Sequence, residues 1–175
     1  MKNIAFVAAR MSSNRLPGKV LKPLVGKPAL EHVLANLQNC SNLTGSIVVM
    51  PVLSMDDLIE KLAEALGIKA VCGSVHDVLD RFRLVAILTE PDRVIRVTGD
   101  EPLIDPEVVD YLIEKHTNSS CEYTTNQIER TYPRGLDVEV IELSALEKCW
   151  HLTADRDDHE HATTYILDHQ ELFKI

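Results

Sequence analysis

Short apolar segments of strand length alternate along the chain with segments in which apolar residues recur every three or four positions. The first pattern indicates buried β-strands and the second amphipathic α-helices. Because the alternation occurs at least four times, it predicts an α/β fold in which a mostly parallel sheet is covered by helices on both faces. The expected strands are residues 3–8, 46–50, 69–72, 92–98, 122–126 and 137–142.

Capping residues place the helices between these strands. Ser54 with Asp57, and Ser74 with Asp77, have the spacing of a capping box, in which side chains accept hydrogen bonds from the free N–H groups of the first turn. Apolar positions spaced for one helical face follow each pair. The expected helices begin at Pro28, Ser54, Ser74, Asp105 and Ser144, and a last helix is expected over residues 158–169.

Size and charge limit the classes of protein to consider. A chain of 175 residues with 45% apolar and 26% charged residues suits one globular domain, residues 1–175. The net charge of −9 argues against general nucleic-acid binding, which needs a broad basic face. The apolar runs are too short to cross a bilayer, and the amino terminus leads into a polar loop. We therefore expect a cytoplasmic protein that neither spans a membrane nor binds nucleic acid.

A basic loop follows the first strand. Arg10, Arg15, Lys19, Lys22 and Lys27 fall within eighteen residues that contain no Asp or Glu. In an acidic protein, such a segment indicates a small anionic ligand, because the remaining surface repels a polyanion. Backbone N–H groups of a loop rich in Ser, Asn and Gly can surround a phosphate, and Arg and Lys add charged donors. The loop lacks the G-x-x-x-x-G-K-[ST] pattern, which argues against a kinase or ATPase of the P-loop type.

Asp100 follows the fourth expected strand, in a turn with Gly99 and Glu101. Ligands of α/β sheets bind beyond the carboxyl ends of the strands, so this turn and the basic loop should meet at one edge. A carboxylate there suits Mg²⁺, which completes its shell with phosphate oxygens and water. The alternative is an ordinary turn residue, because Asp and Gly are common in turns. Glu101 is expected to be solvated.

The stretch from Ile4 to Lys19, with Gly26-Lys-Pro28 beyond it, resembles the opening of the sugar-acid cytidylyltransferases. This family includes the CMP-3-deoxy-manno-octulosonate and acylneuraminate synthetases, and the chain is most similar to the branch of spore coat polysaccharide biosynthesis proteins. The likeness continues at residues 73–81, 96–105, 132–140 and 160–161, and so covers nearly the whole chain. It implies a Rossmann-like, three-layer αβα nucleotide-diphospho-sugar transferase fold, the use of CTP and Mg²⁺, and a homodimer.

The resemblance also implies site residues. Those expected to bind the nucleotide are Ala8, Ala9, Arg10, Ser12, Ser13, Lys19, Gly73 and Arg81. Those expected to act in catalysis are Arg10, Arg15, Lys19 and Asp100, with Asp100 as the Mg²⁺ ligand. Those expected to bind the acceptor are Arg134, Gly135, Asp137, Glu160 and His161. Arg134 can bind a sugar carboxylate through two parallel hydrogen bonds. Without the resemblance, an ordinary hairpin loop is nearly as good an interpretation of residues 134–137.

Two features depart from the family pattern. His159 stands where the spore coat branch usually has Arg. The chain ends at Ile175, whereas such enzymes usually continue with a further strand and helix that carry a second metal-binding Asp. The carboxyl-terminal part of the fold is therefore expected to be missing and a strand edge to be exposed. Residues 137–142 form a plausible pairing strand, and we expect a homodimer joined at least partly through residues 132–141, because exposed edges rarely stay bare.

The favoured function is transfer of CMP from CTP to the hydroxyl group of an acidic sugar, with release of pyrophosphate, for cell-surface polysaccharide synthesis. One alternative is a catalytically impaired nucleotide- or sugar-binding paralogue or partner subunit, which the absence of the second Asp favours. The retained basic loop and the turn at Asp100 favour the enzyme. A third interpretation keeps the enzyme but replaces CTP by UTP or GTP.

Overall fold

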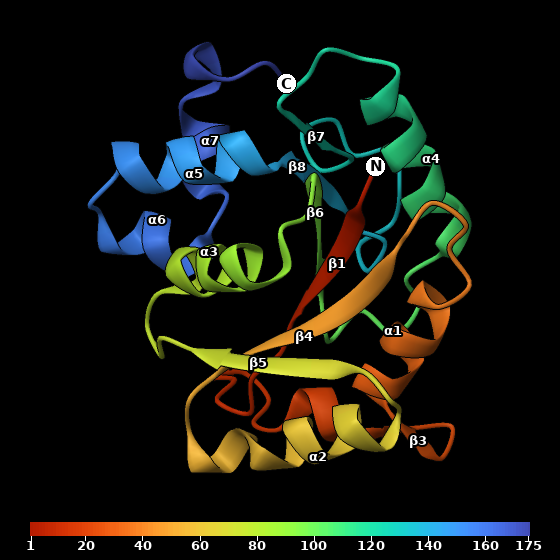
Figure 1. Ribbon diagram of the computed structural model, residues 1–175. Coiled ribbons are helices and arrows are strands. Elements are labelled where there is room, and N and C mark those ends of the chain that lie inside the picture. Colours follow the sequence, from red (N-terminus) through yellow and green to blue (C-terminus); the bar gives the residue numbers. More distant parts are fainter.

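The computed structural model describes residues 1–175 and has a six-stranded sheet between two layers of helices (Figure 1). The strand order is β5-β4-β1-β6-β8-β7, and β1, β4, β5 and β6 are parallel, whereas β8 is antiparallel to both β6 and β7. The strands are β1 (Asn3–Ala8), β4 (Gly45–Pro51), β5 (Lys69–Gly73), β6 (Arg93–Thr98), β7 (Tyr123–Thr125) and β8 (Glu139–Glu142). The predicted mostly parallel sheet is confirmed.

Helices cover both faces of the sheet, as the three-layer αβα prediction requires (Figure 1). One face is covered by α1 (Ala29–Leu37), α2 (Asp57–Ala65) and α4 (Pro106–Thr117). The other is covered by α3 (Val78–Thr89), α5 (Leu143–Leu152), α6 (Arg156–His161) and α7 (Thr164–Asp168). Alternate residues of β1 serve the two apolar cores, since Ala5 and Val7 lie in one and Ile4 and Phe6 in the other. No helix is long and apolar enough to cross a membrane.

Short elements complete the chain. They are the 3₁₀ turns η1 (Lys19–Leu21), η2 (Ser54–Asp56) and η3 (Gln170–Leu172), and the small hairpin of β2 (Pro23–Leu24) and β3 (Lys27–Pro28). The hairpin and η1 lie between β1 and α1 and so extend the basic loop. All four cysteines are free thiols.

Two helix starts differ from the capping-box predictions. Ser54 begins a 3₁₀ turn and caps nothing, and α2 starts only at Asp57. Asp77 is itself the N-cap of α3, where its side chain accepts a hydrogen bond from the Asp80 N–H group at 2.7 Å. The predicted partnership with Ser74 is therefore wrong, because the helix begins after Asp77 and not before it. The predicted cap at Asp105 is confirmed, and it accepts from the Glu107 N–H group.

The predicted helix over residues 158–169 is wrong. The structure has two short helices there, α6 and α7, separated by Ala162 at a φ angle of 61°. This left-handed turn ends α6 and lets Ala162 and Ile166 both reach the second apolar core, where each is fully buried. Burial of these two side chains offsets the strain of a positive φ angle at a residue other than glycine.

The predicted pairing edge at residues 137–142 is also wrong. β8 lies inside the sheet, so its backbone groups already pair with β6 on one side and β7 on the other. The outer side of β7 is flanked by the end of the chain, because the Lys174 carbonyl accepts hydrogen bonds from the N–H groups of Glu122 and Tyr123. The homodimer stays a prediction, without this strand as its interface.

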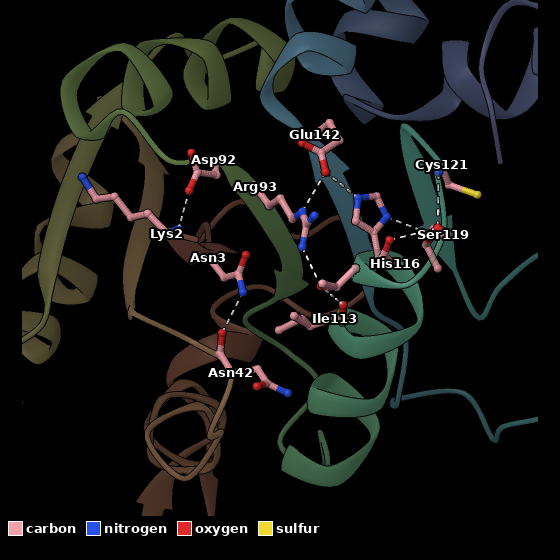
Figure 2. A network of polar contacts seen from close by, with 12 residues as sticks. Lys2, Asn3, Asn42, Asp92, Arg93, Ile113, His116, Ser119, Cys121 and Glu142 are labelled. Carbon is pink, nitrogen blue, oxygen red and sulfur yellow. Dashed lines mark hydrogen bonds and ion pairs between the residues drawn. The ribbon is translucent and has the colours of Figure 1, made fainter.

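Charged side chains at the amino-terminal edge of the sheet form a closed network (Figure 2). Arg93 is 5% exposed and donates to Glu142 Oε1 at 2.7 Å and to the Thr117 hydroxyl at 2.6 Å. His116, 1% exposed, lies with Nε2 2.9 Å from the same Glu142 oxygen and with Nδ1 2.8 Å from the Thr124 hydroxyl. This network joins β6, α4, β7 and β8, so its role is to hold elements together.

Candidate functional site

The basic loop after β1 folds around the Met11 carbonyl oxygen. That oxygen accepts hydrogen bonds from the N–H groups of Ser13 and Gly18, both at 2.9 Å. The Met11 N–H group donates to Asp56 Oδ1 at 2.7 Å, and Asp56 is fully buried. A buried carboxylate from η2 therefore fixes the loop, although the two segments are 45 positions apart. No local pattern indicates this role for Asp56, because it lies in a segment expected to form a helix start.

The turn after β6 brings Asp100 against this loop. The Gly99 N–H group donates to the Ala8 carbonyl at 2.9 Å. A Cβ atom at position 99 would lie 3.1 Å from both Ala9 Cβ and Leu30 Cδ1, so glycine permits the close approach. Asp100 forms an ion pair with Lys19 Nζ. Burial raises the pKa of Asp100, but the hydrogen bond and charge of Lys19 outweigh this effect, so the pKa lies below its ordinary value.

A cavity of about 160 Å³ lies at this carboxyl-terminal edge of the sheet. It brings together eight of the residues predicted for the site, from the first loop, the start of α3, the turn after β6 and the end of α6. The cavity lies beyond the carboxyl ends of β1 and β6, where the basic loop and the turn at Asp100 were expected to meet. The eight residues are Ala8, Ala9, Arg10, Lys19, Arg81, Asp100, Glu160 and His161.

Arg81 is the most unusual residue of this cavity, since it is only 3% exposed and forms no ion pair with a carboxylate. Its Nε atom donates to the Asp77 carbonyl at 3.4 Å. Burial, and then repulsion from Arg10, lowers the pKa of Arg81, and together they outweigh the attraction of the nearby Asp56 and Asp77 carboxylates. Gly73 makes room for its side chain, because a Cβ atom there would lie 2.5 Å from Arg81 Cγ. A buried cation beside a second cation is a site for an anion.

Arg10 is held less tightly than Arg81. Its Nη1 atom is 3.8 Å from Glu160 Oε1, beyond hydrogen-bond distance, and both side chains are nearly half exposed. A surface ion pair of this length adds little stability. Arg10 can therefore exchange its carboxylate partner for a phosphate at small cost.

Other predicted residues lie outside the cavity. Ser12 and Arg15 are exposed, and the Ser13 hydroxyl faces the Leu16 N–H group of its own loop at 3.5 Å. Arg134 and Gly135 lie in the β7–β8 loop, at the same edge of the sheet but away from the cavity lining. Asp137 is already bound by Arg130 through two hydrogen bonds of 2.9 and 3.0 Å, and Gly73 reaches the cavity only through Arg81.

Two residues gain importance in the structure. Arg96 of β6 lines the cavity and forms an ion pair with Glu139, which is 2% exposed. The sequence feature that could have indicated Arg96 is its charge inside an otherwise apolar strand. Glu101, expected to be solvated, has a buried Oε2 atom without a hydrogen-bond partner. Burial, followed by the charges of Asp137 and Asp100, raises the pKa of Glu101 to about 7.

Asp100 is a suitable ligand for Mg²⁺ only together with a phosphate ligand. No group of three or more His, Cys, Asp or Glu side chains is placed to hold a metal ion on its own. Mg²⁺, however, binds through one or two carboxylates plus substrate phosphates and water. Asp100 lines the cavity with about a third of its side chain exposed, beside cations suited to phosphate, so the donor set fits a metal–nucleotide complex.

A larger cavity of about 860 Å³ adjoins the first one at Glu160. Its walls come from His76 and Asp77 before α3, from Trp150 of α5, and from the start of α6. His159 also lines it. The site thus has a small cationic compartment and a larger mixed one that share a wall formed by α6.

Comparison with known proteins agrees with this geometry. The sequence model of the family described as cytidylyltransferase matches residues 4–174. The spore coat polysaccharide biosynthesis protein SpsF of Bacillus subtilis is 32% identical over 181 aligned residues, which cover all of this chain and 74% of that protein. A cytidylyltransferase structure from Leptospira borgpetersenii matches with a TM-score of 0.95 and 31% identity, over 99% of this chain and 74% of that one. The chain is thus shorter than these relatives.

A more distant structure shows the fold alone. The CMP:2-keto-3-deoxy-manno-octonic acid synthetase complexed with CTP matches with a TM-score of 0.76 at 21% identity, over 96% of this chain and 86% of that one. The family model covers almost the whole chain, and the mostly parallel sheet agrees with the fold of the matched structures. The protein therefore belongs to the cytidylyltransferase family.

Proposed function

We propose that this protein transfers CMP from CTP to the hydroxyl group of an acidic sugar and releases pyrophosphate. The observation that carries the proposal is the buried Arg81, which forms no ion pair with a carboxylate and which lines the same cavity as Arg10 and Lys19. Three cations around a small cavity fit the phosphates of a nucleotide better than a neutral ligand. The family match supports a cytidine nucleotide, and the fold neighbour solved with CTP supports the same choice.

The cations act by position and charge. Arg81 and Arg10 present forked donors to phosphate oxygens, and Lys19 provides a compact charge once Asp100 releases it. Stabilising the pyrophosphate as it leaves is the largest contribution such residues make to this class of reaction. No nucleophilic side chain is needed, because the sugar hydroxyl attacks directly.

In this reaction the sugar oxygen forms a bond to the α-phosphorus of CTP, and the bond from that phosphorus to the bridging oxygen of pyrophosphate breaks. The hydroxyl proton is lost to solvent. Mg²⁺ held by Asp100 and phosphate oxygens would supply neutralisation of charge and would lower the pKa of the attacking hydroxyl. Asp100 is suited to hold Mg²⁺ because its pKa is below the ordinary value, so the side chain is an ionised carboxylate at neutral pH.

For the acceptor, we propose the side of the cavity nearer to the β7–β8 loop. β7 ends and β8 begins at the same edge as the turn carrying Asp100, so Arg134 and Gly135 lie at that edge. Arg134 is exposed and forms no ion pair, which leaves its guanidinium group free for a sugar carboxylate. Glu160 and His161 remain candidates from the opposite wall, whereas Asp137 is occupied by Arg130.

Pyrophosphate release tests the proposal. The protein is incubated with Mg²⁺, with each of the four common nucleoside triphosphates, and with a panel of acidic sugars. We expect release only with CTP and only in the presence of an acidic sugar. Release with UTP or GTP would replace CTP as the proposed substrate nucleotide. CTP binding without release for any sugar would favour a binding protein or a subunit that needs a partner.

A further inference from the structure

The short helix α6 is held against α3 by one histidine. His159 Nδ1 lies 2.5 Å from Asp77 Oδ2, and the two side chains are only 19% and 27% exposed. α6 lies beside α3 in the structure (Figure 1) and supplies Glu160 and His161 to the cationic cavity. The contact between His159 and Asp77 therefore lies directly behind one wall of the candidate site.

Both ring nitrogens of His159 face oxygen atoms that can only accept hydrogen bonds. Nδ1 faces the Asp77 carboxylate, and Nε2 faces the Thr153 carbonyl oxygen at 3.1 Å. A neutral imidazole has one N–H group, so it could satisfy only one of these contacts. His116 shows the opposite case, since one of its partners is the Thr124 hydroxyl, which can donate to a neutral ring. The two acceptor oxygens around His159 favour the doubly protonated, cationic ring.

Asp77 transmits this contact to the other wall. Its Oδ1 atom accepts from the Asp80 N–H group and so caps α3, while its carbonyl oxygen accepts from Arg81 Nε. One residue therefore joins the cationic histidine, the start of α3 and the buried arginine of the cavity. Loss of the charge on His159 would weaken the contact between α6 and α3. These two helices carry residues of opposite walls of the cavity.

We propose that protonated His159 is a positioning residue that holds the two walls of the nucleotide cavity together, so that nucleotide affinity falls when the ring loses its proton. The inference rests on the proposed function of the cavity and adds a pH-dependent control to it. His159 lines the larger compartment beside Asp77 but not the small cationic cavity, and it acts on that cavity through Asp77 and through its neighbour Glu160.

The surrounding charges favour the cationic ring. Burial lowers the pKa of His159, but the Asp77 hydrogen bond, the Thr153 carbonyl and the charges of Asp77 and Asp158 outweigh it, so the pKa lies above the ordinary value. The contact is therefore complete at low pH and is lost as pH rises through that pKa. The charged and titratable groups nearby are Asp77 and His76 before α3, Asp155 in the loop before α6, and Arg156, Asp157, Asp158 and Glu160 on α6.

The test is the pH dependence of CTP–Mg²⁺ affinity, measured by calorimetry between about pH 6 and pH 9 on three proteins. They are the wild type, His159→Arg, whose charge is permanent, and His159→Gln, which is neutral. CTP also titrates in this range, so each affinity is divided by that of the arginine variant at the same pH. A carbon-detected NMR titration of the His159 ring in the nucleotide-free wild type gives its pKa independently.

We expect the wild type to match the arginine variant at low pH and to fall at least about fivefold below it at high pH, toward the glutamine variant. The NMR titration should give a pKa for His159 above the ordinary histidine value. Affinity ratios that stay constant across the pH range, or an ordinary or lowered pKa for His159, would overturn the inference. Absence of CTP binding in all three proteins at every pH, with a raised pKa for His159, would instead contradict the proposed function.

Discussion

Two buried arginines at opposite edges of the sheet are held in different ways. At the amino-terminal edge, Arg93 is buried and its charge is neutralised by Glu142, which also contacts His116 (Figure 2). At the carboxyl-terminal edge, Arg81 is equally buried but forms no ion pair; its side chain donates one long hydrogen bond to a carbonyl oxygen, and the Asp56 and Asp77 carboxylates act on it only at longer range. The two arginines are within 2% of each other in exposure, at 5% and 3%, so burial alone does not distinguish them.

What distinguishes the two arginines is whether the side chain forms an ion pair within the protein. A buried ion with its partner inside the fold links elements, and removing one partner exposes the other to a large desolvation cost. A buried ion without a partner stores that cost in the free protein and recovers it when an anion binds. The first arrangement describes a structural network, and the second a binding site.

The largest expected effect is a difference in thermal stability between variants of the two buried arginines. Arg93→Met should lower the free energy of unfolding by about 2–3 kcal/mol, because Glu142 loses its main partner. For a chain of this size, that corresponds to about 5–10 °C in the midpoint of thermal unfolding. Arg81→Met keeps the apolar part of the side chain and removes an unpaired charge, so its midpoint should stay within a few degrees or rise. Equal destabilisation of the two variants in a thermal melt would show that Arg81 is structural.

A smaller effect concerns the carboxylates of the two edges. Asp100→Asn should weaken CTP binding in Mg²⁺ about tenfold and make the affinity the same with and without the metal, because its charge is the expected link to Mg²⁺. The midpoint of unfolding should move by only a few degrees. Asp92→Asn is the matched control, since Asp92 accepts a hydrogen bond from the Lys2 N–H group at the other edge. If Asp100→Asn keeps a full Mg²⁺ dependence, the metal lies elsewhere.

The smallest effect separates two histidines. Burial, with Arg93 adding to it, lowers the pKa of His116 despite the contact with Glu142, whereas the pKa of His159 is raised. Stability linked to His116 is therefore lost as pH falls below the ordinary histidine pKa, and stability linked to His159 is lost as pH rises above it. Chemical denaturation across pH should show both slopes. His116→Gln should remove only the acid-side slope and His159→Gln only the alkaline-side slope, and a swapped pattern would reject these assignments.

The central strands and one part of the site could be predicted from sequence because their signals are local. Apolar runs identified β1, β4, β5 and β6, and the rule that ligands bind beyond strand ends brought Arg10, Lys19 and Asp100 together. The position of β8 could not be predicted, because a short alternating strand does not indicate which strands it will pair with.

The remaining errors have physical causes as well. A positive φ angle at Ala162 has no local sequence signal, and burial of its side chain decides the break between α6 and α7. Asp56 reaches the site from a segment 45 positions from Met11, so the loop pattern could not reveal it, and Arg96 lies inside a strand, where the rule about strand ends did not apply. Arg15 belongs to the basic loop but points to solvent, since the fold of the loop around Met11 decides which cations face inward.

The most direct test of the central claim is calorimetric titration of CTP–Mg²⁺ into the wild type, Arg81→Met and Arg93→Met. The account predicts that Arg81→Met loses at least about tenfold in affinity, the scale of a charged hydrogen bond, although it is the more stable variant. Arg93→Met should bind like the wild type at a temperature where it is folded. Unchanged affinity in Arg81→Met, or an equal loss in both variants, would contradict the assignment of the carboxyl-terminal edge as the nucleotide site.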